Sequence, residues 1–249
     1  MIYNCDSHVG KVRKNNEDYC MGEIIQTEEE SIGIFALADG MGGHKKGEVA
    51  SKIAVESIIN FLKENILQEC GIKMDYLDDV IKQAYNYANK KIYAKSLEDI
   101  SFEGMGTTLV VAVVYRDEAI IANVGDSRCY LLHNDKLKKI TKDHSVVEEL
   151  LSANLITEEE AKHHPRRNQI TRAMGAEEII IVDIFREKIE KDDILLLATD
   201  GLTGCVADES IKEIIMQDKD IKVLCEELIN QANENSGKDN ISVILSKID

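Results

Sequence analysis

Hydrophobic residues in this chain follow two patterns, short apolar runs and longer stretches with helical spacing. The short runs are rich in branched residues and predict strands at residues 32–38, 108–115, 119–124, 128–133, 179–185, 194–198 and 241–246. The longer stretches, at residues 47–65 and 76–96, place apolar residues on one side of an amphipathic helix. Two further helices are predicted at residues 208–216 and 221–234.

The order of these elements indicates the fold class. Strands in hairpin-like succession, combined with long one-sided helices, predict an α/β (α+β) protein with helices packed outside antiparallel sheets. A chain of 249 residues with a single proline and no Gly/Ser-rich linker fits one domain over residues 1–249. From about Lys142 to Arg172 strand-like runs stop, and Thr157 with Glu160 forms a capping-box pattern. We therefore expect two short helices outside the core there, and expect His163 and His164 to be helix-end residues rather than metal ligands.

Three apolar runs end or begin at an aspartate. Asp39 follows IGIFALA, Asp200 follows ILLLAT, and Asp239 precedes NISVIL. Carboxylates at strand ends can converge at one edge of a packed scaffold, and Mg²⁺ and Mn²⁺ prefer such oxygen ligands. The pattern favours metal-assisted hydrolysis, although Asp-Gly is also a common turn dipeptide.

Composition narrows the possible classes. With 46 acidic and 30 basic residues the net charge is −16, which argues against a general binder of nucleic acid or anionic membranes. The six cysteines show neither a CxxC pair nor zinc-site spacing, as expected of reduced thiols in the cytosol. No signal peptide or membrane-span pattern occurs, so we expect a cytoplasmic protein. We also expect a monomer, because no exposed apolar stripe stands out.

The aspartates belong to an ordered series of motifs. RKNNED, ADGMGGHKKGEVAS, GMGTTLVVAVV, NVGDSRCYLL, TKDHS, ITRAMG, ATDGL and GKDNISVIL follow one another between about Asp6 and Leu245. The series resembles the PP2C-type (PPM) metal-dependent serine/threonine protein phosphatases, and the short bacterial branch most closely. The resemblance implies a four-layer α/β-β/α sandwich with metals in a cleft at one end. It also implies that residues 142–172 form a flap that helps to admit and select substrate, with an ordinary surface insertion as the alternative.

The resemblance also implies a role for each acidic residue. Asp39 is expected to bridge two cations, Gly40 to contribute its backbone carbonyl to one of them, and Asp200 and Asp239 to complete the coordination of the other. Such a pair of cations, Mn²⁺ or Mg²⁺ held about 4 Å apart, can activate a water for direct attack on phosphorus. We attribute the glycine at position 40 to close approach of backbone to an ion.

Three more acidic residues are candidate metal ligands. Glu17 and Asp18 match positions near the second metal, and the sequence does not decide which of them contacts it. Asp126 matches the ligand of a third, weaker metal, but VGDS between two strands is also a good hairpin turn.

Two residues match positions that act on the substrate. Arg13 matches the phosphate-binding arginine of the family, and a guanidinium can grip two phosphate oxygens. Met41 stands where animal relatives carry a histidine proposed as general acid. His44 is therefore the candidate acid, with a structural histidine, or a metal-bound water as the acid, as alternatives.

The function predicted from this resemblance is hydrolysis of phosphoserine and phosphothreonine in proteins. Expected partners are phosphoprotein substrates, especially a Hanks-type Ser/Thr kinase and its targets, by analogy with bacterial relatives. The alternatives are an inactive PP2C-like binding module and a phosphatase dedicated to a stress or sporulation regulator. Loss of a metal aspartate would mark the first, and a sensor domain would accompany the second; the sequence shows neither.

Overall fold

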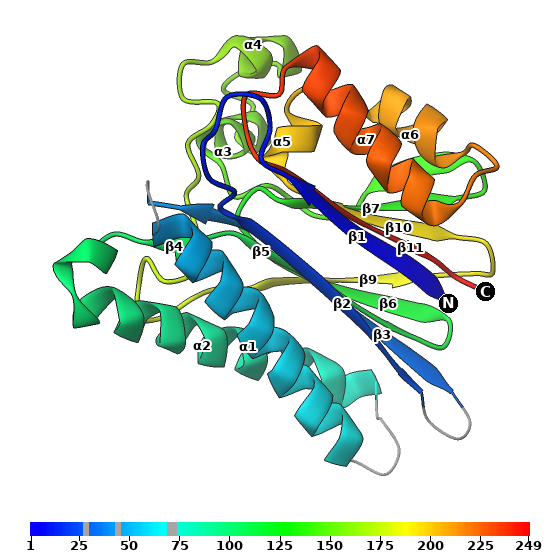
Figure 1. Cartoon of the computed structure of the whole chain (residues 1–249), viewed down its shortest axis with the longest axis horizontal. Helices are drawn as coiled ribbons and strands as arrows, with labels where there is room; N and C mark the ends of the chain where they lie inside the picture. The colour runs from blue at the N-terminus through cyan, green and yellow to red at the C-terminus, as the bar shows by residue number, and fades with distance from the viewer. Residues whose placement is uncertain (27–29, 43–45, 69–73) are drawn as a thin grey trace.

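The chain folds into four layers, in which two antiparallel sheets face each other and helices cover both outer faces (Figure 1). The computed structural model describes residues 1–26, 30–42, 46–68 and 74–249. Three separate apolar clusters fill the three interfaces between the layers. The predicted sandwich of helices around antiparallel sheets is confirmed.

Each sheet is built from strands distant in sequence. The first contains, in spatial order, β1 (Ile2–His8), β11 (Ile241–Lys247), β10 (Ile194–Ala198), β7 (Arg128–His133) and β8 (Lys136–Lys139). The second contains β2 (Asp18–Gln26), β3 (Ser31–Met41), β5 (Leu109–Tyr115), β6 (Glu118–Val124) and β9 (Asp183–Lys188), and the short β4 (Gly106–Thr107) pairs with β3. Several of these strands are buried along nearly their whole length because both of their faces are covered.

Helices form the two outer layers (Figure 1). The long helices α1 (Lys46–Gln68) and α2 (Met74–Glu98) bury apolar faces against the second sheet, and a 3₁₀ turn, η1 (Ile100–Phe102), follows α2. The short α5 (Asp200–Thr203), α6 (Asp208–Ile215) and α7 (Ile221–Asn235) cover the first sheet. None of the helices among the described residues is both long and apolar enough to cross a bilayer.

The segment from Lys142 to Arg172 lies outside the sandwich, as predicted. It holds α3 (Val146–Ser152) and α4 (Glu158–His163), with Thr157 and Glu160 forming the predicted capping box. His163 is the last residue of α4 and His164 its C-cap, so both are helix-end residues as expected.

The prediction of a strand over residues 179–185 is wrong at its start. The strand β9 begins at Asp183, and Ile179 and Ile181 are largely exposed. Branched residues favour strands only where a neighbouring strand pairs with them, and the chain just before this stretch is bonded to α2 instead, since Asn89 donates to the carbonyls of Glu177 and Glu178. The strands β1, β2 and β8 were not predicted, because polar residues interrupt their apolar pattern.

Several strands meet the same end of the sandwich. The strand β2 begins at Asp18, which pairs with Asp39 near the end of β3, while β7 and β11 begin there and β10 ends there. Side chains from five strand ends and their loops are thereby gathered on one edge of the two sheets.

Tyr85 provides a test of how α2 is fixed to the second sheet. Its ring is fully buried, and its hydroxyl lies 3.0 Å from the carbonyl oxygen of Leu109 and 2.8 Å from that of Ala122. We expect Tyr85→Phe to lower the free energy of unfolding by about 1 kcal/mol, because a buried hydrogen bond is lost. Urea unfolding measures this free energy, and Tyr87→Phe on the exposed side of α2 is the control. Equal losses in the two variants would show that the hydroxyl of Tyr85 does not help to fix α2 to the sheet.

Candidate active site

A cavity of about 280 Å³ opens at the end of the sandwich where the strand ends meet. Most of its polar lining comes from acidic residues on five different segments. The lining consists of Arg13, Glu17, Asp39, Gly40, Met41, Gly42, Thr108, Asp126, Asn168, Ile170, Asp200, Asp239 and Asn240. Two lining residues, Asn168 and Ile170, belong to the segment that carries α3 and α4, so that segment forms one wall.

Asp39 stands at the centre of this arrangement, near the end of β3. Its backbone N–H donates to the hydroxyl of Thr108 at 2.8 Å, and its carbonyl oxygen accepts from the hydroxyl of Thr107 at 2.8 Å. Burial raises the pKa of the Asp39 carboxyl well above its usual value, and the nearby charges of Asp18 and Asp200 raise it further. A carboxylate in this position needs a cation nearby to stay ionised.

Gly40 lies where neighbouring backbone leaves no room for a side chain. A Cβ atom there would lie 2.2 Å from the carbonyl oxygen of Gly47 and 2.5 Å from that of Glu17. Packing of α1 and of the start of β2 against β3 therefore requires glycine at this position. Gly40 still lines the cavity.

Asp18 lies behind Asp39 and is almost fully buried. Its Oδ2 atom accepts hydrogen bonds from Ser242 at 2.7 Å and Thr199 at 3.0 Å, while its Oδ1 atom has no hydrogen-bond partner. Burial raises the pKa of Asp18 to about 7, the two hydroxyls oppose that rise, and the charge of Asp200 adds to it. Glu17, the neighbouring candidate, differs in that it lines the cavity directly.

Asp200 and Asp239 reach the cavity from either side of the β10–β11 pair. Asp200 is the first residue of α5, and its Oδ1 atom is buried without a hydrogen-bond partner. Burial raises the pKa of Asp200, and the charge of Asp239 raises it further. Arg13 lies at the rim, half exposed, and its Nη2 donates to Asp239 Oδ2 at 2.9 Å.

Asp126 lies in the turn between β6 and β7, where a hairpin turn was predicted. Asp126 also lines the cavity. Burial raises the pKa of Asp126 to about 7, mainly assisted by the charge of Asp200. A pair of hydroxyls ties this turn to Asp39, since Thr108 Oγ1 lies 2.7 Å from Ser127 Oγ and also accepts from the Asp39 N–H.

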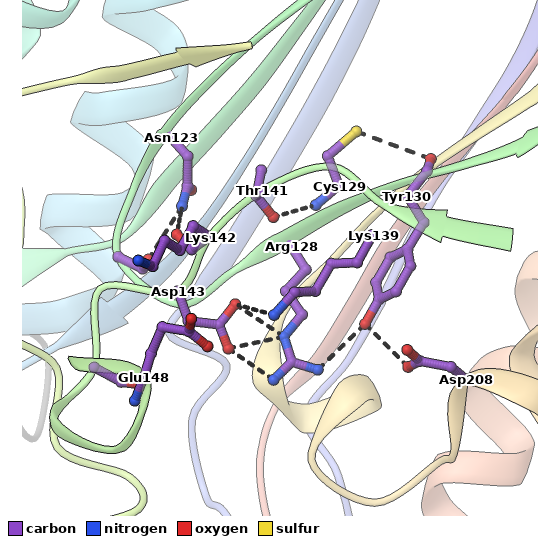
Figure 2. A network of polar contacts seen from close by, with 12 residues as sticks. Asn123, Arg128, Cys129, Tyr130, Lys139, Thr141, Lys142, Asp143, Glu148 and Asp208 are labelled. Carbon is purple, nitrogen blue, oxygen red and sulfur yellow. Dashed lines mark hydrogen bonds and ion pairs between the residues drawn. The ribbon is translucent and has the colours of Figure 1, made fainter. Parts of the chain in front are cut away.

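The residue after that turn, Arg128, is the centre of a second polar network (Figure 2). Its guanidinium bonds to both carboxylate oxygens of Asp143, with Nη2 to Oδ2 at 2.7 Å, and Nη1 donates to the hydroxyl of Tyr130. The hydroxyl of Tyr130 in turn donates to Asp208 at the start of α6. The planar fork of Arg128 therefore fixes the C-terminal side of the Asp126 turn.

The donor set of the cavity fits hard divalent cations. Asp18 and Asp200 each have a buried oxygen without a partner, and burial with mutual repulsion raises the pKa values of Asp18, Asp39, Asp126 and Asp200. Among the described residues, however, no group of three acidic, thiol or imidazole side chains already has the arrangement of a metal cluster. Mg²⁺ and Mn²⁺ do not require such a cluster, because backbone carbonyls and water normally complete their coordination.

The structure brings together most of the predicted site residues. The predicted residues that line one cavity are Arg13, Glu17, Asp39, Gly40, Asp126, Asp200 and Asp239, with Asp18 directly behind. His44, the candidate general acid, lies outside the described residues. The positioning groups Thr108, Ser127, Thr199 and Ser242 were not predicted, because a hydroxyl residue in an apolar run carries no signal of its own in one sequence.

Comparisons with known proteins agree with this geometry. A family model described as protein phosphatase 2C matches residues 6–246. The serine/threonine phosphatase stp of Listeria innocua is 37% identical over 236 residues, covering 95% of this chain and 91% of that protein. The solved structure of the S. agalactiae serine/threonine phosphatase matches with a TM-score of 0.89 and 31% identity, covering 100% of this chain and 99% of that chain. The catalytic domain of the phosphatase PstP, solved with two manganese ions, matches with a TM-score of 0.82 and 31% identity, covering 100% and 98%. The chain therefore belongs to the protein phosphatase 2C family of serine/threonine phosphatases.

Proposed function

We propose that this chain hydrolyses phosphoserine and phosphothreonine in proteins with two divalent cations bound in the acidic cavity. The observation that carries the proposal is the convergence of five acidic residues and one arginine, from segments spread over the whole chain, on one cavity. Several ionised carboxylates buried close together destabilise the fold unless a cation offsets their repulsion.

The residues that would hold the cations are those with oxygens directed to the cavity. Asp39, the Gly40 carbonyl, Asp200 and Asp239 form the expected set, with Glu17 and Asp18 supporting it. When bound, such cations supply Lewis-acid polarisation of phosphoryl oxygens and activation of water. Asp126 is the expected ligand for a third cation, at the turn before β7.

Arg13 would bind the phosphate group of the substrate. Its hydrogen bond to Asp239 uses one of the five N–H donors of a guanidinium, and its position at the rim leaves the side chain half exposed to an incoming ligand. The same bond orients the guanidinium toward the acidic cavity. Hydrogen bonds from Arg13 would neutralise the phosphate charge and fix the orientation of the monoester. His44 stays a candidate for the proton donor to the leaving alkoxide.

Family membership supports a proposal for the cellular setting. We propose that the substrates are phosphoproteins, among them a Ser/Thr kinase and its targets, and that residues 142–172 act as a flap that selects them. The wall formed by Asn168 and Ile170 supports a part for that segment in substrate access. We further propose a single-domain monomer that works in the cytoplasm and uses Mn²⁺ or Mg²⁺.

The metal ligands are tested by removing one charge at a time. We expect Asp200→Asn and Asp239→Asn each to lower kcat/KM for a phosphothreonine peptide by at least about 100-fold, because metal-ligand loss removes several kcal/mol of transition-state stabilisation. Phosphate release with and without Mn²⁺ measures this, with Asp218→Asn in an exposed turn as the control. A wild-type chain inactive with every divalent cation would instead favour the binding-module alternative.

Arg13 is tested by separating its charge from its shape. Removing the guanidinium in Arg13→Ala should lower kcat/KM about 10- to 100-fold, the equivalent of losing about 1.5–3 kcal/mol of charge-assisted hydrogen bonding. Arg13→Lys should recover only part of this activity, because an ammonium cannot form the bidentate contact. Lys14→Ala at the exposed neighbouring position is the control. Equal activity of all three variants would contradict a phosphate-binding role.

The raised pKa values predict how pH changes metal binding. Burial raises the pKa of Asp18 and Asp126 to about 7, so without metal the folded chain retains protons that the unfolded chain releases above pH 4. Stability of the metal-free protein should therefore fall as pH rises from about 4 to 7 and then level off. Since a cation must displace these protons, the increase in Tm on adding Mn²⁺ should be larger at pH 8 than at pH 5.5. Thermal unfolding with EDTA or Mn²⁺ at both pH values checks this, and equal increases would refute it.

A further inference from the structure

His144 holds the backbone of the turn that carries Asp126. The N–H of Gly125 donates to His144 Nδ1 at 3.1 Å, and the N–H of His144 donates to the Gly125 carbonyl at 2.9 Å. Both backbone polar groups of the residue before Asp126 are thus bonded to one histidine, whose side chain is only 5% exposed. Neither contact belongs to the predicted metal or phosphate machinery.

These bonds determine the tautomer of the imidazole. Because Nδ1 accepts from Gly125, the proton of the neutral ring is on Nε2, which lies 3.2 Å from Asp183 Oδ2. Burial lowers the pKa of His144, which favours this neutral form. Arg172 Nη1 donates to Asp183 Oδ1 at 2.8 Å and also lies 3.2 Å from Nε2; because Nε2 carries the proton and cannot accept, the guanidinium holds the carboxylate and not the ring. The chain of contacts runs from Arg172 through Asp183 and His144 to Gly125.

Gly125 lies at a position that requires glycine. Its φ of +110° is in the region that favours glycine, and a Cβ there would lie 2.6 Å from the Thr108 side chain. Asp143 meanwhile grips Arg128 on the other side of the turn, as Figure 2 shows. Two consecutive residues therefore hold the two sides of Asp126, His144 through the backbone of Gly125 and Asp143 through the side chain of Arg128.

The same histidine lies at the base of the segment that forms a wall of the cavity. The N–H of Thr171 donates to the His144 carbonyl at 2.8 Å, and Ser145 forms a β-bridge with Ile170. The start and the end of the flap segment are thus joined directly beside the Asp126 turn. One residue, His144, is thus bonded both to this base and to Gly125.

We infer that His144, oriented by Asp183, is a positioning residue that aims Asp126 at a divalent cation and ties that carboxylate to the base of the flap. This inference rests on the proposed function, because it assigns Asp126 a cation to bind. His144 is not among the residues that line the cavity, so it acts through Asp126. Its acceptor nitrogen keeps Gly125, and hence Asp126, in the orientation that faces the cavity.

Two substitutions separate the two ring nitrogens. In His144→Asn the amide oxygen can take the place of Nδ1 and still accept from Gly125, whereas in His144→Gln the amide reaches the Nε2 position and leaves the Gly125 N–H without its acceptor. Asp183→Ala tests the relay from a partly exposed site, because it removes the acceptor that holds the proton on Nε2. Asp126→Asn defines the binding that depends on this carboxylate.

The experiment is a Mn²⁺ titration of the full chain by isothermal titration calorimetry, with Tm measured for every variant. We expect His144→Gln and Asp183→Ala to weaken the Asp126-dependent Mn²⁺ binding about 10- to 100-fold, the range for loss of a partner that orients a ligand. His144→Asn keeps the acceptor for Gly125 but loses the contact with Asp183, so it should weaken binding less than His144→Gln does. The Mn²⁺ concentration for half-maximal phosphate release should rise in the first two variants, and excess Mn²⁺ should restore the rate.

Distinct results would overturn the inference. Wild-type Mn²⁺ affinity in His144→Gln would show that Gly125 needs no acceptor, and equal losses in Asn and Gln variants that follow Tm would show a role in the scaffold alone. Asp126→Asn binding as many ions as an active wild type would refute the inference and leave the proposed function standing. Absence of any Mn²⁺ binding or phosphate release by the wild type would refute both.

Discussion

The central constraint on this structure is that the sandwich holds several carboxylates close together although their charges repel one another. Strand register within the second sheet places Asp18 beside Asp39, and the termini of β10 and β11 in the first sheet add Asp200 and Asp239. Burial of Asp18, Asp39 and Asp200 makes their charges costly until a cation arrives. The fold's own stability, contributed by three apolar interfaces, makes this strained arrangement possible.

Around this acidic centre, neutral hydroxyls and amides do most of the positioning. Thr108 and Ser127 connect Asp39 to the Asp126 turn, Thr199 and Ser242 hold Asp18, and Asn240 accepts from the Glu17 N–H. Hydroxyls orient a carboxylate without neutralising it, whereas a lysine or arginine in the same places would compete with the metal. Charged partners are found further out, at Arg13 and Arg128, where they stabilise the rim and the turn.

The apolar pattern predicted the core strands and the long helices, and the motif series predicted the acidic residues, because both signals are local. The hydrogen bonds of Asp18 could not be predicted from local patterns, since its partners Thr199 and Ser242 are 181 and 224 residues away along the chain. The reason for glycine at position 40 likewise depends on α1 meeting β3. Contacts between distant segments are fixed by tertiary packing, and a single sequence does not display them.

The antiparallel register of β2 and β3 has a consequence for how this site can change during evolution. Residues pair without interruption from Asp18 with Asp39 to Gln26 with Ser31. The pairing of Asp18 with Asp39 therefore depends on the number of residues in each strand. Deleting one residue inside either strand would turn every side chain beyond it to the opposite face of the sheet. Asp39 would then exchange places with a neighbour of the core, and the acidic centre would be lost although every acidic residue was still encoded.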